Sequence, residues 1–218
     1  MSDIQICMLC FLYVTAEVFA GFLLSRYARW KSEYVRKFIH ILTSLIIVPC
    51  EYSIQSPYWR PLVPAAFILI NAFAVLSGLI GPLGIKDPKR NIGLVLYPVS
   101  VTAVVILESS GVISPSSAIC GVLIMGCGDG SAAVVGTLCG KHGYTVYGKY
   151  HKSLEGSLAM AVVASAVVLI FTDMGIISAL ITGLVMAAVE NLSPSSVDNV
   201  SVPLAAAFLV ELLGKAGV

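Results

Sequence analysis

Long apolar stretches alternate with short polar segments along the whole chain of 218 residues. Eight stretches can be distinguished, at about 4–25, 38–54, 61–80, 92–108, 113–138, 157–172, 174–190 and 200–214. An α-helix needs about 20 apolar residues to cross a bilayer, and backbone groups in lipid need partners within their own segment. The alternation typical of a membrane β-barrel is not found. The pattern predicts one all-α domain over 1–218, a polytopic integral membrane protein with seven or eight transmembrane helices, eight being favoured.

The composition excludes a soluble globular protein. Only 11% of the residues are charged and 58% are hydrophobic, whereas an average soluble domain carries about 25% charged residues. The net charge of +1 gives no reason to expect a nucleic-acid partner. Any functional site must therefore be built from the helices and their short loops, in contact with membrane lipids. A homo-oligomer is left open.

Positive charge is distributed unevenly between the two predicted sides of the membrane. Eleven of the 13 Lys and Arg residues lie after the first, third and fifth stretches, at 26–37, 86–90 and 141–152. With eight spans, these three segments share one side. Because basic loops are retained in the cytoplasm, we expect them and the active site on the cytoplasmic face, with both termini outside.

One polar segment, at about 126–157, begins inside an apolar stretch and is rich in glycine. If the helix continues there, Asp129, Ala133, Gly136 and Gly140 share one face, at i, i+4, i+7 and i+11. A carboxylate in an apolar helix is costly unless it is paired or hydrated. Close helix packing would explain the small residues, but it would not explain the acid. The segment therefore predicts a functional role for Asp129.

Three lysines in this segment are candidates for binding phosphate: Lys141, Lys149 and Lys152. Lys152 precedes Ser153, which is a predicted N-cap of the next helix, and helix N-termini favour anions. The nucleotide-binding pattern G-x-x-x-x-G-K-[ST] is absent from the sequence. Ordinary loop charge remains the alternative explanation for one or two of these lysines.

Two acids follow the seventh apolar stretch, Glu190 and Asp198. The predicted topology places them on the same side as Asp129. Carboxylates together with phosphate oxygens and water are the usual ligands of Mg²⁺, so these acids are candidate metal ligands. A solvated loop with a helix cap at Asp198 is the alternative.

A basic group begins the second stretch, with Arg36 and His40 one helical turn apart and Lys37 between them. These residues could bind a phosphate or a lipid head group, or serve topology alone. Asn71 and Asn199 are candidate contacts to a substrate. For Asn71, lining a cavity and joining two helices are both open.

Two functions fit a membrane protein whose polar groups gather at one face. A transporter would favour paired half-helices and repeat symmetry near mid-membrane, and the sequence has neither. An enzyme that joins a phosphorylated compound to a lipid fits better, since phosphoryl transfer needs mainly positioning, Mg²⁺ and positive charge. The sequence favours the enzyme over a small-anion or lipid transporter.

The central segment resembles the CTP-dependent lipid kinases, the family of dolichol kinase, phytol kinase and CTP-dependent diacylglycerol kinase. The similar residues are Gly128-Asp129-Gly130-x-Ala132-x-x-x-Gly136-x-x-x-Gly140-Lys141 and Lys152-Ser153-x-Glu155-Gly156-Ser157. Supporting segments are Arg36-Lys37-Phe38-Ile39-His40, Gly93-Leu94-Val95-Leu96-Tyr97-Pro98 and Glu190-x₇-Asp198-Asn199-x-x-Val202-Pro203. The resemblance runs from about residue 33 to 204.

The resemblance implies transfer of the γ-phosphate of CTP to a membrane lipid alcohol, with Mg²⁺ or another divalent cation. It implies catalytic roles for Asp129, Glu155 and Lys152, and metal binding by Asp129, Asp198 and Glu190. The nucleotide-binding residues it implies are Gly128, Gly130, Gly136, Gly140, Lys141, Lys149, Ser153, Arg36, Lys37 and His40.

The related CDP-diacylglycerol synthases have a similar core and are the alternative enzyme, a phosphatidate cytidylyltransferase. They carry a Ser-x-x-Lys-Arg…Lys-Asp signature after the core. This chain has no lysine or arginine between Lys152 and Lys215. A second phosphate-bearing substrate would lack its positive partner, so the kinase is favoured.

Overall fold

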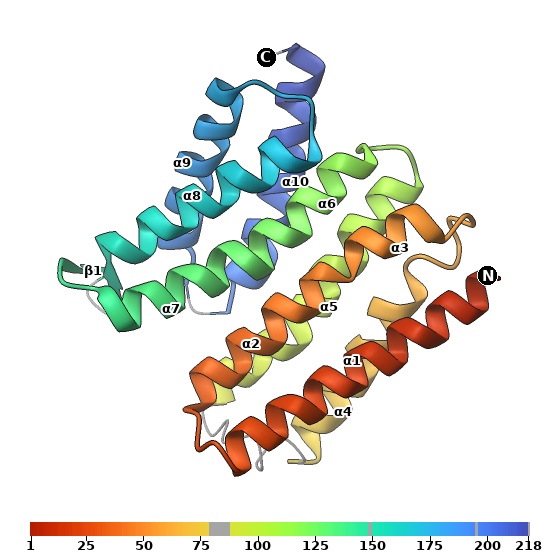
Figure 1. The fold of residues 1–218 in the computed structure, drawn as a ribbon, viewed down its shortest axis with the longest axis horizontal. Coiled ribbons are helices and arrows are strands. Elements are labelled where there is room, and N and C mark those ends of the chain that lie inside the picture. The colour runs from red at the N-terminus through yellow and green to blue at the C-terminus, as the bar shows by residue number, and fades with distance from the viewer. Residues whose placement is uncertain (79–87, 148–149, 195, 218) are drawn as a thin grey trace.

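A computed structural model describes residues 1–78, 88–147, 150–194 and 196–217, with only the backbone described at 88–90 and 150 (Figure 1). The first helices are α1 (Asp3–Arg26), α2 (Ser32–Leu45), α3 (Ile47–Ser53), α4 (Leu62–Leu76) and α5 (Pro88–Ser109). The central elements are α6 (Pro115–Leu123), the π-helix η2 (Ile124–Asp129), α7 (Gly130–Cys139), β1 (Gly143–Val146) and β2 (Tyr150–Ser153). The chain ends with α8 (Leu154–Phe171), α9 (Ile176–Leu192) and α10 (Asp198–Ala216). Each apolar stretch of the sequence is helical over most of its length.

The helices run back and forth along one bundle (Figure 1). The N-terminus and the connections 54–61 and 110–114 lie at the right of that view, and the C-terminus and the connection 172–175 lie at its top. The turn after α1, the β1–β2 hairpin and the end of α9 lie at the opposite end. This arrangement brings Arg36, Lys37 and Lys152 to the same end of the bundle, as the distribution of positive charge predicts.

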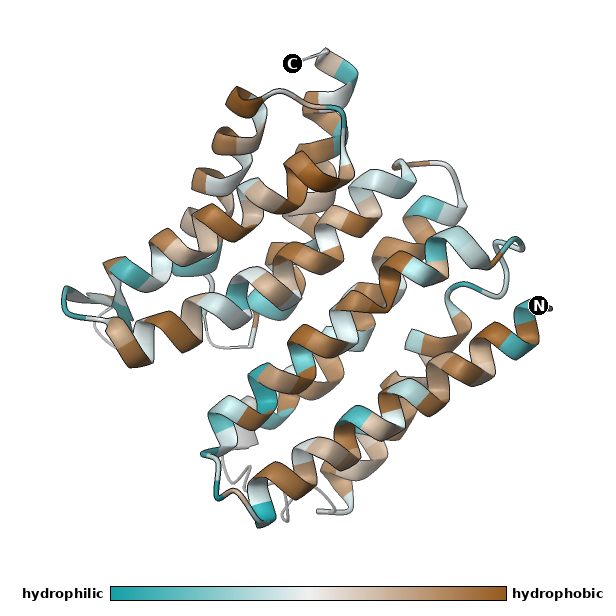
Figure 2. Ribbon diagram, in the orientation of Figure 1, coloured by the Kyte–Doolittle hydropathy of each residue, from teal (hydrophilic) through white to brown (hydrophobic). Residues whose placement is uncertain are grey.

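Among the described residues, five helices are long and apolar enough to cross a membrane: Asp3–Arg26, Asn91–Ser109, Pro115–Cys139, Leu154–Phe171 and Asp198–Ala216. Leu62–Leu76 and Ile176–Leu192 are apolar but shorter. Figure 2 shows hydrophobic residues along most of the helices and polar residues on the hairpin and on the first half of α2. The chain is therefore a polytopic membrane protein by the length and composition of its helices, and the count of eight spans stays a prediction.

The central helix changes its geometry at the segment that the sequence singles out. α6, η2 and α7 follow one another without a break, and the π-helical turn of η2 ends at Asp129. Short π-helical turns inside α-helices occur frequently at functional sites. η2 contacts α2, α8 and α10, so Asp129 lies where several helices meet.

The hairpin is an addition to the all-α prediction. β1 and β2 pair antiparallel, with Gly143 opposite Ser153 and Val146 opposite Tyr150. α8 begins directly after β2. Ser153 is its N-cap, and the Oγ of Ser153 accepts a hydrogen bond from the N–H of Gly156 at 3.2 Å. The predicted cap at Ser153 is confirmed, whereas Asp198 is the first residue of α10 and Val197 its N-cap.

Gly126 should be among the least replaceable glycines. A Cβ there would lie 2.2 Å from the Cβ of Ser44 and 2.9 Å from the carbonyl oxygen of His40. Gly126→Ala should therefore force η2 away from α2 and lower the free energy of unfolding by about 1–3 kcal/mol, the usual cost of overpacking. Thermal unfolding in detergent measures this change. The control is Gly143→Ala, where the nearest atom is 3.8 Å away; equal loss in both variants would contradict the prediction.

Candidate active site

Asp129 is buried at the end of η2 and forms an ion pair with Lys37 of α2, which is also buried. Removing two charges from water is costly unless each has a partner. The pair satisfies that requirement, because it joins the carboxylate of the central helix to the ammonium group of a neighbouring helix. It places two of the predicted site residues in direct contact.

Further charges surround this pair. Asp198, in the first turn of α10, lies within electrostatic range of Asp129, Lys37 and Lys152. Arg36 lies within electrostatic range of Asp129 and Asp198, and its Nη2 is 2.7 Å from Oε1 of Glu33. Charges of alternating sign therefore converge from α2, η2 and α10.

Lys152 of β2 extends this group, through an ion pair with Glu190 of α9. Glu190 is buried, and the side chain of Lys152 is 24% exposed. Beside this pair, the hydroxyl of Tyr144 donates to Oδ1 of Asn191 at 2.7 Å, which fastens the hairpin to α9. We refer to six of these residues as the charged cluster: Arg36, Lys37, Asp129, Lys152, Glu190 and Asp198.

Polar atoms without a hydrogen-bond partner lie next to the charged cluster. The rings of His40 and Tyr97 are 4.4 Å apart at their centroids, and His40 interacts electrostatically with Asp129. In the described part of the chain, His40 Nδ1, the hydroxyl of Tyr97 and Nε of Arg36 are buried and have no hydrogen-bond partner. Buried polar groups normally have a hydrogen-bond partner. These atoms are therefore candidates to form hydrogen bonds with a ligand at this side of the charged cluster.

Asn199 and Asn71 have different surroundings. Asn199 is buried in α10, and a Cβ at Gly93 of α5 would lie 2.8 Å from its Nδ2. Asn199 therefore lies beside the charged cluster, next to Asp198. Asn71 donates from Nδ2 to the carbonyl oxygen of Leu94 at 2.8 Å, which joins α4 to α5. It also lines a cavity, so both interpretations of Asn71 apply.

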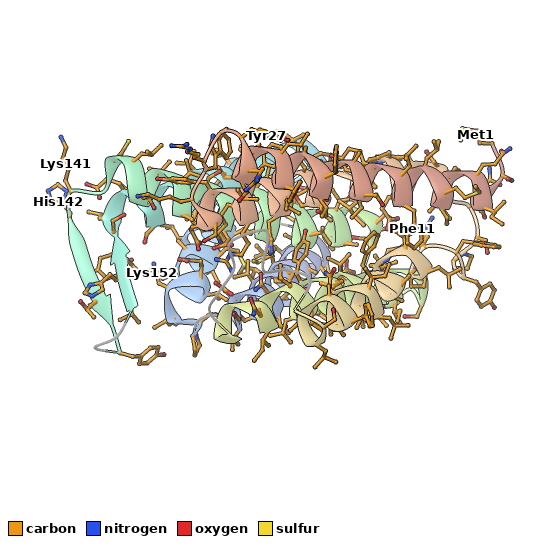
Figure 3. The ribbon with its side chains drawn as sticks, turned by 90° about the horizontal axis from the view of Figure 1, so that it is seen from below. Met1, Phe11, Tyr27, Lys141, His142 and Lys152 are labelled. Carbon is orange, nitrogen blue, oxygen red and sulfur yellow. The ribbon has the colours of Figure 1, made fainter. Side chains whose placement is uncertain are left out.

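Other predicted site residues lie outside the charged cluster. Lys141 is exposed between the end of α7 and the start of β1, beside His142 (Figure 3). Glu155 accepts from the N–H of His142 at 3.3 Å and lies 2.8 Å from its Nδ1, so it ties α8 to the start of the hairpin. Lys149 lies outside the described residues.

The four glycines of the central motif face protein atoms. An added Cβ would lie 2.6 Å from Sδ of Met160 at Gly128 and 2.6 Å from Cγ1 of Ile41 at Gly130. At Gly136 and Gly140, it would lie 3.0 Å from Oγ of Ser153. These glycines allow the central helix to pack closely on α2 and α8, which is the packing explanation that the sequence left open.

The carboxylates of the charged cluster are suited to Mg²⁺. In the parts of the chain that the structure describes, no group of three or more His, Cys, Asp or Glu side chains could hold a metal ion. Mg²⁺ is commonly held by one or two carboxylates, with substrate phosphates and water as the remaining ligands. Asp129 and Asp198 are two carboxylates within electrostatic range of each other, and Lys37 pairs with Asp129.

Sequence reasoning missed Tyr97 as a site residue and did not pair Lys37 with Asp129. The pairing joins residues 92 positions apart, and no sequence pattern records it. A signal for Tyr97 was present, because a tyrosine next to a proline within an apolar helix is polar and lies at an irregularity. That signal carries no information about which helix the hydroxyl faces.

Comparison with known proteins provides independent information on the family. No protein-family profile matches the sequence, and no solved structure matches it. The chain is similar to the phytol kinase of Synechocystis sp., with 30% identity over 164 residues, covering 73% of this chain and 67% of that protein. The chain belongs to the CTP-dependent polyprenol kinase family.

Proposed function

We propose that this protein transfers the γ-phosphate of CTP to the hydroxyl of an isoprenoid alcohol of the phytol type, in a reaction that requires Mg²⁺. The observation that carries the proposal is the charged cluster, in which positive and negative side chains from five elements converge at one end of an otherwise apolar bundle. The similarity to a phytol kinase supports the identity of donor and acceptor.

Positive side chains at the edge of the charged cluster are suited to hold the phosphates. The side chains of Lys152 and Arg36 are 24% and 14% exposed, whereas that of Lys37 is 6% exposed. The nucleotide would therefore approach from the hairpin side, where Lys152 and Arg36 can reach its β- and γ-phosphates. Lys37 would then keep Asp129 ionised from within the bundle.

Asp129 and Asp198 would hold the metal ion. Mg²⁺ bound there would neutralise charge on the phosphates, which is its usual contribution to phosphoryl transfer. The protein residues supply positioning, since Asp129 is fixed by Lys37 and Asp198 by the start of α10. The sequence has no Lys or Arg between Lys152 and Lys215, which favours an uncharged acceptor over phosphatidate.

The charged cluster and the basic connections lie at the same end of the bundle, so we place both on the cytoplasmic side. Eight membrane crossings would then leave both termini outside. A reporter fused to the C-terminus would contradict this orientation if it were active in the cytoplasm.

The decisive assay uses purified protein in lipid nanodiscs with γ-labelled or α-labelled CTP, Mg²⁺ and phytol. We expect the label to reach the lipid from the γ position only, and chelation of the metal to stop the transfer. Transfer from the α position, with phosphatidate as acceptor, would instead identify a cytidylyltransferase. Absence of transfer to any alcohol by folded protein would contradict the proposal.

A further inference from the structure

An apolar cavity lies between the N-terminal helices, beside the charged cluster. It is lined by residues of α1, α2, α3, α4 and α5, with one residue of α6. These helices run side by side along the bundle (Figure 1). Most of the lining side chains are aliphatic, such as Val14, Ile39 and Val101, so the cavity is suited to a hydrocarbon chain.

The two ends of the cavity differ in chemistry. At one end lie His40 and Tyr97, which are 5% and 6% exposed and whose Nδ1 and hydroxyl have no hydrogen-bond partner in the described structure. At the other end, Nη1 of Arg60 is 3.1 Å from Oε2 of Glu51 and 2.5 Å from Oε1 of Glu108. The apolar cavity therefore has a polar end at His40 and Tyr97 and a charged end at Arg60.

We infer that this cavity holds the hydrocarbon chain of the acceptor alcohol, with the hydroxyl between His40 and Tyr97 and the far end of the chain at Arg60. The inference rests on the proposed function and adds the place and the length of the substrate. The alcohol would donate its O–H to His40 Nδ1 and accept from the Tyr97 hydroxyl, which satisfies both buried atoms. Because His40 lies one helical turn from Lys37 on α2, and Lys37 pairs with Asp129, this position presents the hydroxyl to the charged cluster.

The cavity also sets the length of the alcohol. The lining residues of α2 and α3 run from Ile39 to Glu51, a distance of about 18 Å at about 1.5 Å per residue. A C–C bond of about 1.5 Å advances a staggered chain by about 1.3 Å, so the lined span corresponds to about 14 bonds. This is close to the main chain of phytol or geranylgeraniol. The free volume of the cavity, about 120 Å³, is smaller than such a chain, so the lining side chains must move apart to admit it. Longer polyprenols would meet the ion pairs of Arg60, which an apolar chain cannot replace without leaving charges unsolvated.

The first test places a larger side chain in the cavity, near the end formed by Arg60. Val105 lines the cavity on α5 and is 3% exposed, whereas Val99 of the same helix is 37% exposed and does not line it. Val105→Phe should lower kcat/KM about tenfold for geranylgeraniol and phytol and leave geraniol within about twofold. Val99→Phe is the matched control and should leave all three unchanged. Activity toward geraniol shows that the variant is folded, and an equal loss for all alcohols would overturn the inference.

The second test measures whether an alcohol occupies the cavity, and it does not depend on catalysis. Cys10 and Cys50 line the half of the cavity nearer Arg60, with their Sγ atoms 3.3 Å apart, and Cys139 is exposed on α7. Geranylgeraniol should slow the alkylation of Cys50 by a small maleimide, geraniol should do so much less, and Cys139 should be unaffected. Mass spectrometry of protein in nanodiscs measures each rate. Equal rates with both alcohols would overturn the inference.

The two tests separate this inference from the proposed function. If Cys50 is protected by geranylgeraniol but no alcohol is phosphorylated, the cavity is confirmed and the kinase proposal fails. If alcohols are phosphorylated without protection of Cys50 and without an effect of Val105→Phe on the preference for chain length, the kinase proposal stands and the cavity assignment fails.

Tyr97→Phe gives a further check of the cavity assignment. The substitution should raise the KM for the alcohol and leave the KM for CTP unchanged.

Discussion

Replacing Asp129 by asparagine should reduce phosphate transfer by roughly 10²–10³-fold, the loss seen when one group that stabilises a transition state is removed. The substitution removes a charge and little volume, so it removes the proposed metal ligand and leaves the shape of η2 unchanged. Transfer of γ-labelled phosphate to phytol measures the effect. The matched control is Glu211→Gln, a carboxylate at the other end of the bundle that accepts from the N–H of Ser114.

A loss of stability must be separated from a loss of chemistry in this experiment. Asp129→Asn leaves the ammonium group of Lys37 buried without its partner, and breaking a buried ion pair costs about 3–5 kcal/mol. The double variant Lys37→Met with Asp129→Asn removes both charges and should recover most of the thermal stability. We expect it to remain inactive. Recovery of activity together with stability would show that Asp129 only holds the fold together.

The second large effect is expected from Lys152→Met. Lys152 is the partly exposed lysine of the charged cluster, so the substitution should raise the KM for CTP about tenfold or more, which corresponds to a loss of about 1.4 kcal/mol in binding. The KM for the alcohol should change little, because the proposed acceptor cavity lies on the other side of Asp129. Steady-state kinetics with each substrate varied in turn provide both constants.

Lys215→Met is the control for this experiment, since Lys215 is exposed at the other end of the bundle and pairs with Glu211 at 3.0 Å. It removes the same charge and should leave both constants unchanged. If Lys152→Met raised the KM for the alcohol more than that for CTP, Lys152 would belong to the acceptor and not to the phosphates. The roles assigned to the two sides of Asp129 would then have to be exchanged.

The sequence predicts the helices well because the membrane imposes a simple rule on them. Apolar runs near 20 residues have no alternative to helix in lipid, and the structure places helices in all eight runs. It predicts Ser153 as a helix N-cap for a similarly local reason. The hairpin at 143–153 was not predicted, because its strands are four residues long and their pairing depends on the turn between them.

In the candidate site too, the sequence identifies residues by local signals and does not show which of them come together. Asp129 stands out in the sequence because a charge is costly in an apolar helix. Lys152, Glu190 and Asp198 stand out because they lie in the few polar segments of the chain. Glu155 and Lys141 stand out equally, yet the structure pairs Glu155 of α8 with His142 and leaves Lys141 exposed before β1. Sequence spacing measures distance along one helix, and it contains nothing about which neighbouring helix a side chain meets.

By itself, the sequence determined that this protein is a polytopic helical membrane protein, and its central motif indicated the kinase family. Hydropathy and motif order are properties of the chain alone. Only the tertiary structure decided that Asp129 pairs with Lys37, that Tyr97 and His40 share the end of an apolar cavity, and that Arg60 closes the other end. Those contacts join residues far apart in sequence, and they exist only because the helices pack side by side.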